Sequence, residues 1–370
     1  MKPIYIVSWL FALAVSFVSC DDWLDKTPKD RLYPDVYFKT EDELRLFTNQ
    51  FYNNLVPSAV DIYSESSDLI VKSDLMLEMS GQRIIPDEGN GWNFTALRDI
   101  NFYLQYSHNC TEVNARNRYD GVARFFRAYF YFEKVKRYGD IPWYDKALDS
   151  DDPELYKARD SREFVMQKML EDLDFAIANL PKTKNAYVLT RWTALALKSR
   201  VCLFEGTFRK YHGLEDCEKY LNACVSASET FMNESGYTLY KSGSTPYRDL
   251  FASINLQADE VIFGRDYEAS LSVLHNVQNY ENSTTMGRPG MNKKIVNSYL
   301  MADGSRFTDK AGYETMTFDQ ECQNRDPRLA QTIRTPGYTR IGSTKKEAPN
   351  LAYTMTGYHL IKYSMTANYD

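Results

Sequence analysis

Histidine is scarce in this sequence, and the absences that accompany it exclude several classes of enzyme. His108, His212, His275 and His359 lie more than 60 residues from one another, so they cannot form the closely spaced pairs that zinc motifs use. A phosphate-binding GxxxxGK[ST] loop, a GxSxG nucleophile elbow and a CxxC pair are absent as well. A glycosidase that uses two carboxylates far apart in the sequence is not excluded by these observations.

Cysteine and net positive charge are also scarce. The sequence has 44 lysines and arginines against 50 aspartates and glutamates, a net charge of −6, so no nucleic-acid partner is expected. Five cysteines, an odd number, follow the first 100 residues. Cys217 and Cys224 lie about 10 Å apart along an expected helix, beyond disulfide reach. We expect small apolar cysteines on helix faces, and the sequence predicts no metal and no cofactor.

Only the first twenty residues contain a long apolar run. Lys2 precedes an apolar stretch at 4–18 that is too short to span a membrane and is typical of a signal peptide. The order of small residues before Cys20 resembles a bacterial lipoprotein signal, although Phe17 stands where leucine is commoner. We therefore expect residues 1–19 to be a lipoprotein signal peptide and Cys20 to carry the lipid. The alternative is an ordinary secretory signal with an accidental cysteine.

Aromatic residues are abundant, with 28 tyrosines, 20 phenylalanines and 5 tryptophans, and many follow helical spacing. The helices expected from this spacing are 41–55, 92–104, 121–138, 161–180, 191–206 and 217–231. Their expected caps and stops are Thr40 with Glu43, Asp160, Thr190, Gly139 and Gly206. Strands are expected at 237–240 and 260–263. The pattern predicts a mostly α (α+β) fold, a tetratricopeptide-like (TPR-like) scaffold of helical hairpins with short strands and long irregular loops.

Two segments without core periodicity, 61–91 and 264–290, are candidates for a binding surface. A sugar ring offers an apolar C–H face and a rim of hydroxyls, so its site needs flat aromatic rings beside amide, carboxylate or guanidinium groups. The candidate ligand-binding residues are Asp74, Arg83, Tyr267, His275, Asn276, Gln278, Tyr280 and Arg288. The alternative is that both segments are ordinary polar surface loops. Trp92 could serve as a sugar platform, but we expect it to pack in the core.

Several motifs, in order along the chain, resemble those of one protein family. The most recognisable are RFFRAY at 124–129 and RYGDIP at 137–142, preceded by CDDWLD at 20–25. Further similarities are NSY at 297–299, DG at 303–304, RDPRL at 325–329, GY at 357–358 and KY at 362–363. Together these segments resemble the SusD/RagB family of outer-membrane nutrient-uptake lipoproteins from Bacteroidetes. The sequence departs from the family at Val122, where an acidic residue is usual.

The resemblance implies a function. Members of this family lie on the cell surface, bind oligosaccharides or, in the RagB branch, peptides, and cover a SusC-like TonB-dependent transporter that receives the ligand. They are not enzymes. The resemblance thus implies a lipid-anchored, surface-facing protein of the outer membrane that binds glycans for nutrient uptake. A peptide-binding RagB-type protein and a TPR-like scaffold that binds only proteins are the alternatives.

The resemblance also implies an organisation of the chain. The lipoprotein signal peptide at 1–19 is followed by an N-terminal helical region at 20–235 and by the start of a C-terminal SusD/RagB region at 236–370. Because family members continue with further helices, the chain is expected to be C-terminally incomplete. Family ligand loops fall in places similar to 61–91 and 264–290, but they vary too much for any single residue to be carried over.

Overall fold

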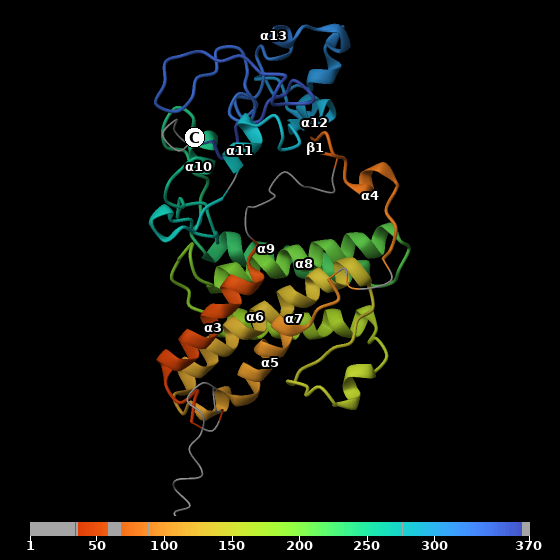
Figure 1. Ribbon diagram of the computed structural model, residues 1–370, viewed down its shortest axis with the longest axis vertical. Helices are drawn as coiled ribbons and strands as arrows, with labels where there is room; N and C mark the ends of the chain where they lie inside the picture. Colours follow the sequence, from red (N-terminus) through yellow and green to blue (C-terminus); the bar gives the residue numbers. More distant parts are fainter. Residues whose placement is uncertain are drawn as a thin grey trace, which may run out of the picture.

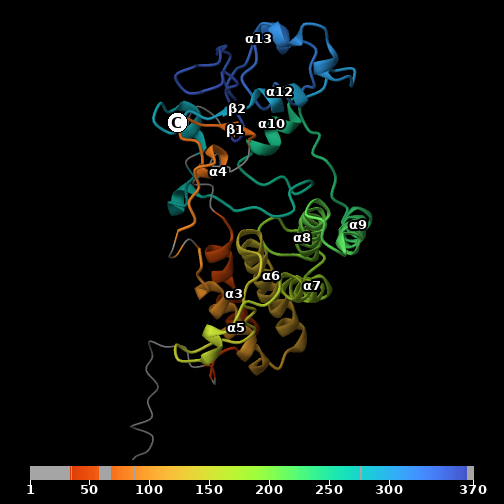
Figure 2. The same ribbon diagram turned by 90° about the vertical axis from the view of Figure 1, so that its right-hand side faces the viewer.

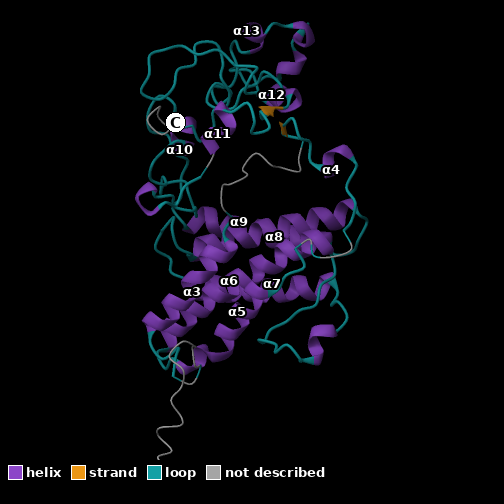
Figure 3. Cartoon of the chain, viewed as in Figure 1, coloured by secondary structure: helices purple, strands orange, loops and turns teal. Residues whose placement is uncertain are grey.

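The computed structural model describes residues 34, 36–57, 68–86, 89, 91–275 and 277–364. These residues form a helical lobe and a second lobe made mainly of loops (Figure 1). Figure 3 shows that the long helices gather in the first lobe and that the two short strands lie in the second. The mostly α fold expected from the sequence is confirmed. In the part of the chain that the structure describes, no helix combines the length and the apolar character that a membrane span requires.

The helical lobe is built around one long central helix, α6. Its long helices are α3 (Glu41–Leu55), α5 (Thr95–Tyr106), α6 (Val113–Tyr138), α7 (Arg162–Asn179), α8 (Arg191–Tyr211) and α9 (Cys217–Glu234), with short turns η2 (Ser107–Asn109) and η3 (Pro153–Tyr156). Helix α6 packs against α3, α5 and α7, and α7 packs in turn against α8. A short link joins α8 to α9, and these helices lie along each other as a hairpin (Figures 1 and 2).

The second lobe consists of short elements connected by long loops. In chain order they are β1 (Ile70–Val71), α4 (Leu77–Ser80), α10 (Pro246–Phe251), η4 (Ala269–Leu271), α11 (Val277–Asn282), β2 (Gly290–Met291), α12 (Lys293–Ser298), η5 (Phe307–Asp309), η6 (Tyr313–Thr315) and α13 (Phe318–Glu321). Strands β1 and β2 pair antiparallel, with Ile70 opposite Met291 and Val71 opposite Gly290. This pair connects the early part of the chain to the late part.

Capping signals place several helix ends where the sequence predicts them. The Thr40 hydroxyl accepts a hydrogen bond from the Glu43 N–H, and the Glu43 carboxylate accepts one from the Thr40 N–H, which confirms the capping box of α3. Thr190 caps α8. Gly139 follows α6 with a φ of 72°, a conformation that favours glycine. These ends depend on side chains close in sequence, which is why local patterns find them.

Other helix ends differ from the expectation. Helix α7 is capped by Ser161, whose hydroxyl accepts from the Phe164 N–H, and not by Asp160. The Asp160 carboxylate instead accepts from the Trp143 N–H at 2.7 Å, so a tertiary contact removes it from the cap. Helix α6 begins at Val113, before the expected residue 121.

The expected end of α8 at Gly206 is wrong, because the helix continues to Tyr211. A Cβ atom at Gly206 would lie 2.7 Å from Cδ2 of Leu221 and 3.1 Å from the carbonyl oxygen of Cys217, both on α9. The glycine therefore permits the close approach of the two helices of the hairpin. It does not act as a C-terminal cap.

The expected strands at 237–240 and 260–263 do not form. The two segments do lie beside each other, since the Thr238 N–H donates to the Asp259 carbonyl at 2.9 Å. The next hydrogen bond breaks the ladder, because the Tyr240 N–H donates to the Glu260 carboxylate at 2.7 Å and not to a backbone carbonyl. A polar side chain takes the place of a strand partner.

The aromatic side chains of α6 form the main core, as expected. Phe126 is buried and contacts Phe51 of α3, with 6.1 Å between the ring centroids. Tyr131 is also buried and stacks on Trp143 at 4.3 Å. The five cysteines within the described ranges are free; Cys110 and Cys202 are buried, and Cys217, Cys224 and Cys322 are half-buried.

A buried ion pair links α6 to α7. The Arg127 guanidinium donates to both carboxylate oxygens of Asp172 at 2.7 Å, and both side chains are almost fully buried. The same guanidinium donates to the side-chain carbonyl of Asn101 on α5 at 3.2 Å. Since a buried charge without a partner is costly, these three helices are held at fixed positions relative to one another.

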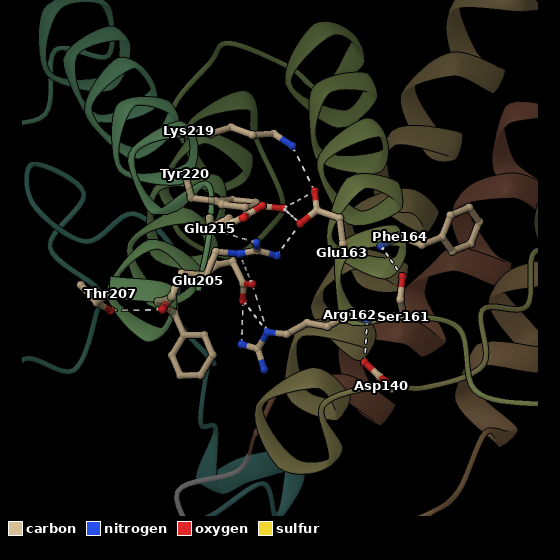
Figure 4. A network of polar contacts seen from close by, with 12 residues as sticks. Asp140, Ser161, Arg162, Glu163, Phe164, Glu205, Thr207, Glu215, Lys219 and Tyr220 are labelled. Carbon is tan, nitrogen blue, oxygen red and sulfur yellow. Dashed lines mark hydrogen bonds and ion pairs between the residues drawn. The ribbon is translucent and has the colours of Figure 1, made fainter. Parts of the chain in front are cut away.

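A second charged network joins α7, α8 and α9 (Figure 4). The buried Glu205 of α8 accepts from Arg162 of α7 at 2.6 Å and from Arg209 at 2.8 Å. Glu163 of α7 accepts from the Tyr220 hydroxyl of α9 at 3.1 Å, and it also pairs with Arg209. Helical hairpins that neighbour one another in sequence are thereby connected by charge as well as by apolar packing.

Replacing Asp172 by alanine should lower the free energy of unfolding by about 3–5 kcal/mol, because Arg127 would be left buried and unpaired. The matched control is Asp42→Ala, which breaks the exposed pair with Arg45 on α3 and should cost less than about 1 kcal/mol. Chemical denaturation of both variants measures the difference. Equal, small losses in both variants would contradict a structural role for the buried pair.

Candidate functional site

The two segments expected to bind ligand share an edge. Strand β1 lies in the first segment and β2 ends the second, and the Ser73 N–H adds a hydrogen bond to the Gly287 carbonyl at 2.7 Å. Elsewhere the segments diverge, because α4 and the turn at η4 lie on opposite sides of the molecule in Figure 1. Asp74 and Arg83 are exposed on the first segment. Sequence reasoning could not place the two segments relative to each other.

In the second segment the structure brings Tyr267 and His275 together. A short turn closed by the Glu268 N–H and the Val273 carbonyl sets their rings edge to face, 4.9 Å apart. Burial lowers the pKa of His275, so the ring is neutral at pH 7. Of the other candidates in this segment, Asn276 and the side chain of Gln278 lie outside the described residues.

Tyr280 differs from the expectation of an exposed stacking ring. It lies on α11, is 6% exposed, and packs in the core of the second lobe with Met291 and Ile333. Arg288 is half-buried and donates to the Leu351 carbonyl at 2.6 Å, which ties its loop to a neighbouring one. The geometry of both residues favours a packing role.

A cavity of about 590 Å³ lies elsewhere, on the helical lobe. It opens between the start of α5 and the link from α6 to α7. Its lining residues are Trp92, Phe94, Thr95, Leu97, Arg98, Asn101, Pro142, Tyr144, Lys146, Leu148, Leu155, Lys157, Ala158 and Arg159. The volume and the mixed apolar and polar lining are typical of small-ligand sites.

Hydrogen bonds from α5 hold the far wall of this cavity. The Asn101 amide donates to the Tyr144 carbonyl at 2.8 Å and to the Lys146 carbonyl at 3.3 Å. The Arg98 guanidinium donates to the Leu148 carbonyl at 3.2 Å. Because Asn101 also accepts from the buried Arg127, the wall is connected directly to the core ion pair.

Trp92 forms one side of the cavity mouth. It is 40% exposed although Arg159 lies over its ring at 4.9 Å and Phe94 contacts it edge to face at 5.3 Å. The expectation that Trp92 packs in the core is therefore wrong in part. Helix α5 begins only at Thr95, so Trp92 lies before the helix and is not part of its buried face. A helix start placed after Trp92 is the sequence signal that could have shown that this side chain is partly exposed.

A second cavity, of about 420 Å³, lies in the loop lobe between Phe318, Leu351 and Tyr358. Its one acidic lining residue, Glu321, is buried but fully engaged. Its carboxylate accepts from the Tyr358 hydroxyl at 2.7 Å and pairs with Lys293 at 3.1 Å. Burial and this hydrogen bond raise the pKa of Tyr358. The Glu321–Tyr358 hydrogen bond is a structural contact between α13 and the loop that contains Tyr358.

Within the described ranges, no three His, Cys, Asp or Glu side chains lie close enough together to hold a metal ion. The first cavity has no carboxylate in its lining. What it does combine is aromatic surface with guanidinium, ammonium and amide groups. That combination suits recognition of a polar ligand with apolar faces, which is how a sugar ring presents itself.

Comparison with known proteins identifies the family. Residues 80–191 match the SusD-like_2 model, described as starch-binding and associating with the outer membrane, and residues 250–370 match the SusD_RagB model of the SusD family. The chain belongs to the SusD/RagB family. This carbohydrate-binding family is associated with the outer membrane, and the resemblance inferred from the sequence motifs is confirmed.

Similar proteins agree with this assignment. SusD-like protein P2 of Formosa agariphila is 26% identical over 294 residues, which cover 74% of this chain and 55% of that protein. SusD-like protein P38 of the same organism is 24% identical over 226 residues, which cover 55% of this chain and 43% of that protein. The chain thus spans about half the length of the curated relatives it matches.

Solved structures show the same fold. A SusD-like protein of Bacteroides fragilis superposes with a TM-score of 0.71 at 21% identity, covering 90% of this chain and 70% of that one. A SusD-like carbohydrate-binding protein of the same species superposes with a TM-score of 0.67 at 16% identity, covering 88% of this chain and 68% of that one. A third structure, with a xylogluco-oligosaccharide, superposes with a TM-score of 0.55 at 16% identity, covering 80% of this chain and 58% of that one.

Tyr280→Ala should destabilise the loop lobe by about 3–5 kcal/mol, because it removes a large buried ring from the core. Tyr267→Ala, in the same segment but half-exposed, is the matched control and should cost much less. Chemical denaturation and glycan titration of both variants separate packing from binding. A Tyr280→Ala protein with unchanged stability and weakened glycan binding would restore Tyr280 as a ligand contact.

Proposed function

We propose that this protein is a surface-facing lipoprotein of the outer membrane that binds oligosaccharides and delivers them to a SusC-like TonB-dependent transporter. Membership of a carbohydrate-binding, outer-membrane-associated family supports the first part of this proposal. The lipoprotein-like order of residues at 1–20 supports the anchor. The related structure that holds a xylogluco-oligosaccharide supports the class of ligand.

The observation that carries the proposal is the cavity beside Trp92, called the Trp92 cavity from here on. Its indole remains 40% exposed in a folded core that buries most other large aromatics of the helical lobe. A flat exposed ring next to Phe94 can receive the apolar face of a sugar. The neighbouring Lys157 and Arg159 can donate to its hydroxyl rim. Trp92 and Phe94 directly precede α5, and Arg98 and Asn101 of α5 hold the link from α6 to α7 by hydrogen bonds.

The Trp92 cavity supports binding and not hydrolysis. Glycosidases use a pair of carboxyl groups on either side of the scissile bond. No aspartate or glutamate is among the residues that line this cavity. A sugar held there would have no general acid or nucleophile from the lining, which supports a role of this cavity in binding.

Loss of the aromatic platform should weaken glycan binding. Trp92→Ala is expected to reduce affinity by about 1–3 kcal/mol, the value of burying one large apolar side chain. The ligand is first identified on native affinity gels that contain starch, xyloglucan or pectic polysaccharides, with an oligopeptide column in parallel. Calorimetry then measures the affinity of the variant for that ligand. Tyr211→Ala, on an exposed ring of α8, is the matched control. Unchanged affinity in a folded Trp92→Ala protein would exclude this cavity.

Cys20 lies outside the described residues, and its role is tested in cells. Cys20→Ala should move the protein from the membrane fraction to a soluble fraction, because several acyl chains on one residue provide stable anchoring. The strain for this fractionation lacks the partner transporter, so that a protein contact cannot replace the lipid. A variant that stays in the membrane fraction under these conditions would contradict the anchor assignment.

A further inference from the structure

The charged side chains that line the Trp92 cavity are all cationic, although the chain as a whole is acidic. Its lining contains four cationic side chains, Arg98, Lys146, Lys157 and Arg159, and no carboxylate. The complete sequence has a net charge of −6. A cationic side chain that has no carboxylate partner attracts an anionic ligand more strongly than a neutral one.

Three of the four cations already have carboxylate partners outside the lining. Arg98 lies 3.9 Å from Asp149. Lys146 pairs with Glu154 at 2.9 Å, and Lys157 pairs with Asp160 at 3.0 Å. These pairs reduce the charge that the three side chains can offer to a ligand.

Arg159 is different. Across the described ranges no carboxylate pairs with it, and its guanidinium lies over the Trp92 ring with 4.9 Å between Cζ and the ring centroid. No hydrogen bond within the described ranges engages the guanidinium N–H groups of Arg159, so they are available to a ligand. The side chain is exposed, and its position is set by the ring beneath it. This is the arrangement that recognises a carboxylate or sulfate through two parallel hydrogen bonds.

We propose that the Trp92 cavity selects acidic oligosaccharides, and that Arg159 is the residue that determines this specificity. The ligand carries a carboxylate or sulfate group that bonds to Arg159 while a sugar ring packs against the exposed aromatic surface of Trp92 and Phe94. This inference rests on the proposed glycan-binding function and adds the chemical class of the ligand.

The test compares acidic oligosaccharides with their neutralised partners, using the full chain. The probes are a uronate, a sialylated and a sulfated oligosaccharide, each paired with its carboxyl-reduced or desulfated form. Calorimetry should show that at least one acidic member binds about tenfold or more tightly than its partner. The sulfate pair and the carboxylate pairs identify which anion is recognised.

Variants then assign the preference to one side chain. Arg159→Gln should bring the acidic and neutral affinities to within about twofold of each other, and Arg159→Lys should retain part of the preference because it keeps the charge but not the planar fork. Arg45→Gln removes an exposed arginine of α3 that lies outside the lining and should change nothing. Thermal melting confirms that each variant is folded.

Three results would overturn the inference in whole or in part, and they differ in what else they overturn. If neutral probes bind as tightly as acidic ones, acidic selectivity is wrong, and if Arg159→Gln keeps the preference, Arg159 is not the residue that determines it; in both cases glycan binding stands. If the wild-type protein binds none of the six probes and no polysaccharide in the affinity gels, the proposed function fails together with the inference.

Discussion

The arrangement of the helical lobe depends on one buried contact, the bidentate pair between Arg127 on α6 and Asp172 on α7. Both charges are removed from water, so each requires the other. Arg127 also bonds to Asn101 of α5, and Asn101 holds the backbone at Tyr144 and Lys146. A chain of hydrogen bonds therefore runs from the centre of the core to the wall of the Trp92 cavity. The same polar contact that positions three helices also shapes the candidate binding site.

This connection explains why the cavity lies on the helical lobe and not in the loops. A binding site needs side chains held at fixed positions, and hydrogen bonds from α5 hold the loop that lines the cavity against the helical core. The loop lobe is held by short pairings such as β1 with β2 and by buried groups such as Glu321 with Tyr358. Its polar segments remain candidates for further ligand contacts, but their tips lie on opposite sides of the molecule in Figure 1.

Much of the helical lobe could be predicted from the sequence, because its signals are local. The capping box of Thr40 and Glu43, the cap at Thr190 and the stop at Gly139 need only neighbouring residues. The errors arose where a distant residue decides the outcome. Gly206 lies inside its helix, where it permits the close approach of Leu221 from α9. The segment at 237–240 is no strand because a glutamate side chain replaces a backbone partner.

The site itself was harder to predict than the fold. Trp92, Tyr144 and Arg159 are far apart in sequence and meet only through tertiary structure, so no spacing pattern identifies them. Loop composition pointed to 264–290, yet Tyr280 from that segment is part of a core. Composition describes what a segment contains, and it does not determine which side chains face water.

The central claim is that oligosaccharide binds in the Trp92 cavity. Amide hydrogen exchange of the full chain, with and without a bound oligosaccharide, tests it most directly because it reports on every segment at once. We expect slower exchange in the segments that line the cavity, 92–101 and 142–159, when glycan is bound. Slower exchange confined to 68–86 and 264–290, with the cavity segments unchanged, would contradict it and would place the site in the loop lobe.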